Sequence, residues 1–416
     1  MVRMRWTMVL AALACLAIAG LTACGDDDND KAAKTSTSEG KAATGKPINV
    51  LSTSFVDAPF GSVPEIWTGA EVAAKNINEA GGIDGRPIKI VTCNGKGDPK
   101  AEEACARKGV SEDAVASSGN IFVANAGGAM EVLQRAQISD IAGATGDPAA
   151  LALDNAYPIS FDAASVNACG APTALDAAGD DAKVGAVVEQ TPFGKGAFSL
   201  LEPYLKSPEV GDKYVGSVSV APTQQDFSSI VQDLDDKGAN YVIPALAPGG
   251  VSKVVSAAGT SGKKWTFCAD AGSFPPPLLA KLAPLTKGFF TSGGFPPTSS
   301  ADKYPLIARF VKEMEATQKG SLESNPIAAM RAWIGVFIIS EVARGIDGDV
   351  TAESFANAMK TAKVDLDYAD VDFSKPLGKP PFVRQFQPNA FVSRWNSENK
   401  EAEDLGQVNL VETLGQ

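Results

Sequence analysis

Short apolar runs alternate with longer amphipathic stretches along most of this chain. Between positions 63 and 80 the apolar residues are spaced four, three and four residues apart: Ile66, Ala70, Ala73 and Ile77. This spacing places them on one face of a helix. The run PINVLSTSF at 47–55 predicts a strand before that helix, and residues 87–91 begin another strand after it. Strand, helix and strand in this order form the crossover unit of a parallel sheet.

The alternation continues in two separate series. The first series adds helices at 98–109 and 129–137 and strands at 120–125 and 138–142. After 157–161 the pattern restarts, with helices at 168–178, 196–205, 227–234 and 250–258 and strands at 183–189, 214–220, 240–243 and 265–268. Two series predict two α/β domains, each with a parallel sheet and crossover helices. Further helices at 302–317 and 328–344 follow both series, and either domain could contain them.

Three glycines between positions 81 and 85 raise the question of a phosphate-binding loop. Gly81, Gly82 and Gly85 follow a predicted helix rather than precede one. The C-terminal end of a helix exposes carbonyl groups and repels phosphate, so we interpret these glycines as a helix cap and a tight turn. The stretch GKAATGKP at 40–47 is close to a nucleotide-binding loop, but Pro47 stands where the metal-binding Ser or Thr belongs.

The N-terminus has the pattern of an export signal. Arg3 and Arg5 precede an apolar core at 8–21 that is too short to span a membrane. The residues LTAC at 21–24 resemble a bacterial lipobox, so we expect a lipoprotein signal peptide at 1–23 and lipidation of Cys24. The alternative is an ordinary signal peptide with a chance cysteine. Residues 24–46 contain no aromatic or large aliphatic side chain and predict a flexible tether.

Composition excludes several classes of function. The chain has no histidine, which excludes His-based catalytic triads and the usual His-containing zinc sites. An even number of cysteines in an exported protein favours two disulfide bonds, and no C-x-x-C spacing supports a metal or redox site. The four that remain after the signal and the lipid site are Cys93, Cys105, Cys169 and Cys268. A net charge of −12 at pH 7 argues against nucleic-acid binding. We therefore expect neither an enzyme nor a metal or cofactor site.

Several segments resemble one known family in the same order. The stretch TGAEVAAKNINEAGGIDGRPIKIVTCNGKGDPKAEEACARKGV at 68–110 is similar to the first helix, turn, strand and helix of the type I periplasmic binding proteins. Within them it is most similar to the leucine/isoleucine/valine-binding group. The segments AGATGDPAAL, TPFGKGAF and TQQDFSSIVQDLDDKGANYVIPA resemble later parts of that family. The resemblance extends over 47–395, nearly the whole mature chain.

This resemblance implies two Rossmann-like, doubly wound parallel-sheet lobes joined by a three-segment hinge. Lobe one would hold 47–160 and 293–384, and lobe two would hold 161–292 and 385–416, with crossings near 160–162, 291–293 and 384–389. A ligand would bind between the lobes and close them by hinge motion. The resemblance also implies the binding subunit of an ABC importer, lipid-anchored to the outer face of the bacterial cytoplasmic membrane. Its permease and ATPase subunits would be other chains.

The resemblance also implies ligand-binding residues. Ala144 and Thr145 would bind the carboxylate of a ligand through a backbone N–H and a hydroxyl. Gly127 falls where the family has a serine, and its N–H would contribute to an anion-binding nest. Asp270 lies at or beside the family's acid that binds an α-ammonium group. The plainer interpretations are a turn cap for Thr145 and a helix N-cap for Asp270.

Two aromatic residues complete this set of candidates. Phe193 matches a stacking aromatic of lobe two, and Phe60, in the loop after the first strand, would cap the cleft from lobe one. Ordinary hydrophobic contacts are the alternative for both, because large apolar side chains mostly belong to the core.

The cysteines can be paired within this two-lobed frame. Cys93 ends a strand and Cys105 lies on the following helix, whereas Cys169 and Cys268 both belong to lobe two. Bonds within each lobe leave the hinge free, so we predict Cys93–Cys105 and Cys169–Cys268. Four buried thiols are the alternative.

The expected ligand is a branched-chain or other hydrophobic amino acid or a related small carboxylate. A second hypothesis is a ligand-sensing receptor domain of the same fold that signals to a membrane partner.

Overall fold

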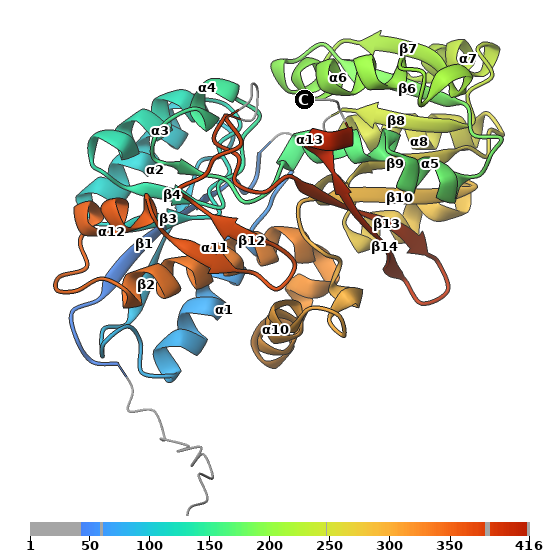
Figure 1. The fold of residues 1–416 in the computed structure, drawn as a ribbon. Helices are drawn as coiled ribbons and strands as arrows, with labels where there is room; N and C mark the ends of the chain where they lie inside the picture. Colours follow the sequence, from blue (N-terminus) through green and yellow to red (C-terminus); the bar gives the residue numbers. More distant parts are fainter. Residues whose placement is uncertain (1–42, 59–60, 247, 379–382, 414–416) are drawn as a thin grey trace, which may run out of the picture. The chain divides into compact units, whose positions relative to one another are not determined.

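The first of two main sheets contains the earliest strands of the chain. The computed structural model describes residues 43–58, 61–246, 248–378 and 383–413. Five parallel strands follow the order β2-β1-β3-β4-β5 in this sheet (Figure 1). Their bounds are β1 (Ile48–Ser54), β2 (Ile88–Asn94), β3 (Ala116–Ser118), β4 (Ser139–Ile141) and β5 (Ala156–Tyr157).

Helices from two distant parts of the chain pack around this first sheet. The early ones are α1 (Glu65–Glu79), α2 (Pro99–Ser111), α3 (Ala126–Arg135) and α4 (Pro148–Leu151). The late ones are α10 (Pro305–Ser324), α11 (Pro326–Arg344) and α12 (Ala352–Met359), followed by the hairpin β11 (Lys363–Asp365) and β12 (Asp370–Asp372). Helix α11 lies beside α1 in Figure 1, and both contribute to one hydrophobic core with β1. The long helices, for which periodicity alone left either domain open, therefore pack with the first sheet.

The second sheet contains seven strands in the order β14-β13-β10-β9-β8-β6-β7. The strands from β6 to β10 are parallel, and β13 and β14 are added antiparallel to β10 and to each other. The strand bounds are β6 (Val184–Glu189), β7 (Tyr214–Val220), β8 (Tyr241–Ala245), β9 (Thr266–Asp270), β10 (Gly288–Gly293), β13 (Asn389–Asn396) and β14 (Glu401–Asn409).

The helices of the second half pack on both faces of this sheet. Alternate residues of β6 belong to different hydrophobic cores: Ala186 to one and Val187 to the other. Because side chains alternate across a strand, the sheet is covered on both sides, as in a doubly wound fold. The helices are α5 (Pro172–Ala178), α6 (Pro192–Leu205), α7 (Ser228–Asp236), α8 (Pro248–Thr260), α9 (Pro276–Leu282) and α13 (Leu410–Thr413), with the 3₁₀ turns η1 (Asp162–Gly170), η2 (Gly211–Lys213), η3 (Ala271–Ser273), η4 (Ala283–Leu285) and η5 (Thr298–Ser300).

The chain passes between the two sheets three times: after β5, after β10 and before β13. Hydrogen bonds join these passages to one another. Arg384 Nε donates to the Ala156 carbonyl at 3.1 Å, and Gln387 Nε2 donates to the Ile159 carbonyl at 3.0 Å. Arg331 of α11 donates to Ser160 Oγ at 3.0 Å. Two doubly wound sheets with three connecting passages are the arrangement that the resemblance implied.

Both predicted disulfide bonds are present. Cys93 of β2 is bonded to Cys105 of α2, and Cys169 of η1 is bonded to Cys268 of β9. Each bond therefore joins elements around a single sheet.

The glycine-rich loop is a turn, as predicted. Gly82 has φ +72°, and a Cβ at this position would lie 2.3 Å from the Arg86 carbonyl oxygen. Only glycine fits this close approach, which turns the chain from α1 into β2.

One predicted strand is wrong. Residues 120–125 form no strand apart from an isolated bridge between Ile121 and Ala144, and β3 lies earlier, at Ala116–Ser118. The physical reason is that hydrogen bonds to side chains, some from the segment and some to it, take the place of strand pairing. Asn120 Oδ1 accepts a hydrogen bond from the Thr53 N–H at 2.7 Å, and a buried carboxylate binds the N–H groups of the residues that follow.

Among the described residues one helix, α11, is long and apolar enough to cross a membrane. Of the most apolar 18 residues in that helix, 83% are buried inside the protein. Trp333 of this helix is buried and donates through Nε1 to Glu313 at 2.8 Å. Helix α11 is therefore a core helix of the folded protein.

Candidate functional site

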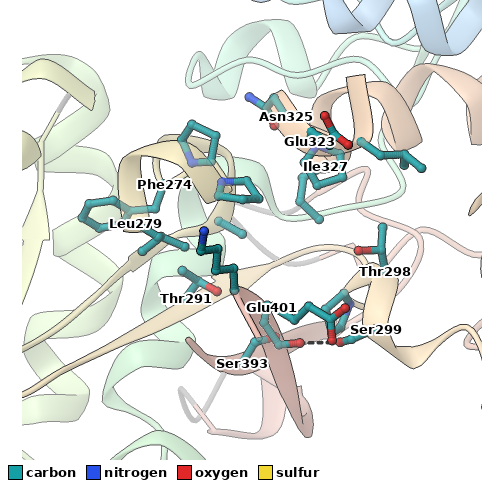
Figure 2. A pocket seen from close by; sticks show the side chains of 18 of the residues that line it. Phe274, Leu279, Thr291, Thr298, Ser299, Glu323, Asn325, Ile327, Ser393 and Glu401 are labelled. Atoms are coloured by element: carbon teal, nitrogen blue, oxygen red, sulfur yellow. Dashed lines mark hydrogen bonds between the residues drawn. The ribbon is translucent and has the colours of Figure 1, made fainter. Parts of the chain in front are cut away.

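A cavity of about 540 Å³ is bordered by elements that belong to both sheets (Figure 2). One wall is the segment 271–280, which includes η3 and α9, and the floor is formed by β10 and the β13–β14 hairpin. The opposite wall is α10 and the start of α11, which pack with the first sheet. A ligand in this cavity would contact elements that pack with the first sheet and elements that pack with the second.

The lining of the cavity is mostly apolar. Carbon surface comes from aromatic, proline and aliphatic residues on all walls: Phe274, Pro275, Leu279, Phe295, Val311, Leu322, Pro326, Ile327, Phe391 and Trp395. Apart from the charged residues, the polar side-chain groups are hydroxyls, one amide and the indole N–H of Trp395, and in Figure 2 Thr291 and Ser393 lie on the strand side while Asn325 lies on the helix side. Sites of this kind bind small molecules through burial of apolar surface, with a few polar groups that set orientation.

Every charged residue that lines the cavity is exposed at its rim. Lys319 and Glu323 form a pair at 3.9 Å with side chains 67% and 69% exposed. The other charged lining residues are Glu315, Lys400 and Glu401, all exposed. The interior of the cavity, as formed by the described residues, therefore contains no charge.

Two local sequence features shape the walls. The run Phe274–Pro277 leads into α9 with three prolines, and Pro276 stands at its first position, where a missing N–H has no effect on the helix. Helix α10 is interrupted at Gln318, whose φ of −145° and ψ of 50° are not helical. The short segment after this break carries Lys319, Leu322 and Glu323 into the cavity wall.

The loops after β1, β3 and β4 are held together by a buried polar network. Asn120 Nδ2 and Ser117 Oγ both donate to Asp140 Oδ1 at 2.8 Å. Asn120 also accepts from the Thr53 N–H at 2.7 Å through Oδ1 and from the Ala144 N–H at 2.7 Å through its carbonyl. These bonds fix the carboxyl ends of three adjacent strands, the edge of a parallel sheet where ligands commonly bind.

A buried glutamate binds the backbone in front of α3. Glu102 of α2 is 1% exposed, and its carboxylate accepts from the N–H groups of Val123, Ala124 and Asn125 at 2.7 to 3.1 Å. Successive backbone N–H groups of this kind form an anion-binding nest. The protein's own carboxylate occupies it, and a ligand carboxylate has no access to these three donors.

Asp270 acts as a helix cap in the structure. Its Oδ2 accepts from the Ser273 N–H at 3.1 Å, which caps η3, and its Oδ1 accepts from Ser165 Oγ at 3.0 Å. Its neighbour Ala271 lines the cavity, whereas Asp270 is not among the lining residues. The binding of a ligand ammonium by Asp270 stays a prediction.

The predicted carboxylate-binding residues also have partners within the protein. The Ala144 N–H is used by Asn120, so it is not a donor for a ligand. Thr145 Oγ1 accepts from the Asp147 N–H at 3.1 Å, which is the turn-cap alternative. A Cβ added at Gly127 would lie 3.3 Å from Asp147 Oδ2. A carboxylate bound at Gly127 would therefore approach another carboxylate.

Of the two aromatic candidates, Phe60 lies outside the described residues, and Phe193 is described only as part of the backbone of α6. Gly127 lies in the first turn of α3, Ala144 and Thr145 follow β4, and none of the three is among the residues that line the cavity. Their ligand contacts stay predictions.

Sequence reasoning missed the residues that form the cavity. The FPPP run at 274–277 was a visible signal, because three prolines after a strand form a rigid wall that ordinary turns lack. The contributions of Trp395 and the α10–α11 connection had no local signal, because they depend on the tertiary packing of distant segments.

Comparison with known proteins defines the class of protein. The family described as "Periplasmic binding protein" matches residues 53–399 of this chain. The match covers most of the sequence, and the chain belongs to this family of solute-binding proteins, which are not enzymes.

Individual relatives agree with this assignment. The chain is 25% identical over 262 residues to a "Leu/Ile/Val-binding protein homolog 1" of Brucella melitensis, which covers 61% of this chain and 68% of the relative. A fatty acid ABC transporter substrate-binding protein from Thermomonospora curvata has the same fold with a TM-score of 0.70 at 17% identity, over 91% of this chain and 96% of that one. A solute-binding protein of an ABC transporter from Rhodopseudomonas palustris, in complex with 3,4-dihydroxybenzoic acid, has a TM-score of 0.71 at 15% identity, over 89% and 99%.

Proposed function

We propose that this protein is the extracytoplasmic solute-binding lipoprotein of an ABC importer. It captures a branched-chain or other hydrophobic amino acid, or a related small carboxylate, and delivers it to permease and ATPase subunits on other chains. Lipidation at Cys24 and the tether at 24–46 would keep the folded unit close to those subunits at the outer face of the cytoplasmic membrane.

The observation that carries this proposal is the apolar cavity of about 540 Å³ with walls from both groups of elements. Cavities of about 300 to 1,000 Å³ hold most small ligands of proteins. A ligand that contacts α9 on one side and the start of α11 on the other stabilises the arrangement in which both walls are close. Binding therefore favours a closed form, which a transporter can distinguish from the empty protein.

The ligands named for the relatives support the same class of solute. The Brucella relative is named for leucine, isoleucine and valine, and the two structural relatives for a fatty acid and for 3,4-dihydroxybenzoic acid. These molecules share a carboxylate and an apolar body. An apolar cavity with charges confined to its rim suits that combination.

Thermal unfolding in the presence of candidate solutes tests the proposal. The chain from Gly40 onward forms one compact unit and is refolded from denaturant to remove any bound solute. The panel contains the twenty amino acids, aromatic and branched carboxylates, short peptides and sugars. A solute at 100 times its Kd adds about 2.7 kcal/mol of stability. Stabilisation by sugars or peptides alone would contradict the proposal.

A further inference from the structure

We propose that the ligand is an apolar monocarboxylate without an ammonium group, and with an aromatic or medium-length aliphatic body. This inference rests on the proposed function, because it takes the cavity as the solute site. It narrows the broader class by excluding α-amino acids as the preferred ligands.

The first argument is that the cavity interior provides no partner for an ammonium group. An ammonium removed from water requires a hydrogen-bonded acid, because its desolvation is costly. Among the described lining residues the acids are Glu315, Glu323 and Glu401, all of them exposed at the rim. Glu323 is moreover paired with Lys319 at 3.9 Å. An ammonium group in the interior would be left with hydroxyls, the Asn325 amide and carbon surface, none of which carries a charge.

The second argument concerns Asp270, a half-buried acid beside the cavity lining. Asp270 directly precedes the lining residue Ala271, but both of its oxygens accept hydrogen bonds from the protein. Oδ2 also lies 3.4 Å from Ser273 Oγ. Turning this carboxylate towards a ligand would uncap η3 and break its hydrogen bond with Ser165, which would keep only the Ser292 carbonyl at 3.3 Å as an acceptor. The geometry therefore opposes the use of Asp270 as an ammonium partner.

The third argument is the size of the cavity. A volume of about 540 Å³ exceeds what the side chain of valine or leucine fills, and unfilled apolar volume gives up favourable contacts. A phenylpropyl or octyl body would fill more of the volume between the α9 wall and Ile327 on the opposite wall (Figure 2). A carboxylate at one end of such a body remains at the exposed rim, where it stays hydrated.

The test compares molecules that differ only in the ammonium group. Isothermal titration of the refolded chain from Gly40 onward uses 3-phenylpropionate against phenylalanine, octanoate against 2-aminooctanoate, and 4-methylpentanoate against leucine. We expect the amine-free member of each pair to bind at least about 10-fold more tightly, since an unpaired buried polar group costs one or more factors of ten. Equal or tighter binding of the amino acids overturns the inference but leaves the proposed function intact. If no member of any pair binds while another class of solute does, the proposed function itself fails.

Three variants locate the effect in the cavity. Ala271→Asp adds a carboxylate to the wall and should raise the affinity for phenylalanine relative to 3-phenylpropionate by about 10-fold. Ala271→Asn has nearly the same size without the charge and should leave the ratio unchanged. Ala280→Trp, on the exposed side of the α9 wall, should weaken both members of each pair. Unchanged binding in Ala280→Trp, with an unchanged melting temperature, means that the ligand binds elsewhere and overturns the inference.

Discussion

At the residue scale, the most consequential side chain near the strand ends is a buried acid that the sequence did not reveal. Glu102 lies on a helix whose sequence, KAEEACARK, looks like a solvated amphipathic surface. Its neighbour Glu103 is indeed exposed and pairs with Arg107. Glu102 instead turns inward and binds three successive N–H groups of the loop before α3. This carboxylate shapes the loop at 120–125 and displaces the strand predicted there.

Replacement of Glu102 by Gln should destabilise the protein by about 2 to 3 kcal/mol. The amide keeps one acceptor but places an NH₂ group against N–H donors, which leaves buried donors without an acceptor. Glu103→Gln removes the same charge from the adjacent exposed position and should cost no more than about 0.5 kcal/mol. Urea unfolding at neutral pH measures the free energy of unfolding of both variants. Similar losses in the two variants would mean that the nest is not a stabilising contact.

The residues predicted for ligand binding illustrate what sequence can and cannot provide. Thr145 and Asp270 were identified with two possible roles each, and their capping contacts are present in the structure. Capping is a local interaction that depends on neighbours within three residues, so sequence spacing reveals it. Ligand contacts depend on which segments meet across the two sheets. The lining by Phe274, Ile327 and Trp395 therefore appears only in three dimensions.

At the scale of elements, periodicity predicted most helices and strands because their buried faces follow regular spacings. Helix α1 and strand β7 lie where the pattern placed them. The strand β14 was missed, because Glu401–Asn409 carries many polar residues and lies at the edge of its sheet, where it pairs with β13 alone. The hairpin β11–β12 and helix α12 are short and gave no clear period. Edge elements with little buried surface are thus the ones that sequence patterns fail to reveal.

The contact between α1 and α11 gives a prediction at this scale. Gly69 lies inside α1, where Ala normally improves helix stability by about 1 kcal/mol. A Cβ at Gly69, however, would lie 1.9 Å from the Ala329 carbonyl oxygen of α11. We expect Gly69→Ala to destabilise the protein by about 2 to 3 kcal/mol, because the helices must separate.

A second helical glycine provides the control. A Cβ at Gly320 of α10 meets nothing within 4 Å, so Gly320→Ala should be neutral or stabilise by up to about 1 kcal/mol. Denaturant unfolding of both variants gives the comparison. If Gly69→Ala is as stable as Gly320→Ala, then α1 and α11 do not pack as closely as the structure indicates.

At the scale of the whole molecule, three chain passages and one buried arginine couple the two groups of elements. Arg331 is 8% exposed and donates to Ser160 on the first passage. Its guanidinium also lies 5.2 Å from the centre of the Phe295 ring, on the second passage. An arginine between two passages can change partners as they move, which suits a protein that alternates between open and closed forms.

The disulfide bonds, in contrast, should affect stability without affecting closure. The two bonds close loops of unequal length, with sequence separations of 12 for Cys93–Cys105 and 99 for Cys169–Cys268. In the chain-entropy account a longer loop restricts the unfolded chain more, so replacing both cysteines by Ala should cost about 3 kcal/mol in the first case and about 4.5 kcal/mol in the second. Urea unfolding should show this order, and titration with 3-phenylpropionate should show an affinity within twofold of the unmodified chain. An affinity loss in either variant would mean that its bond stabilises the closed arrangement and not only the elements around one sheet.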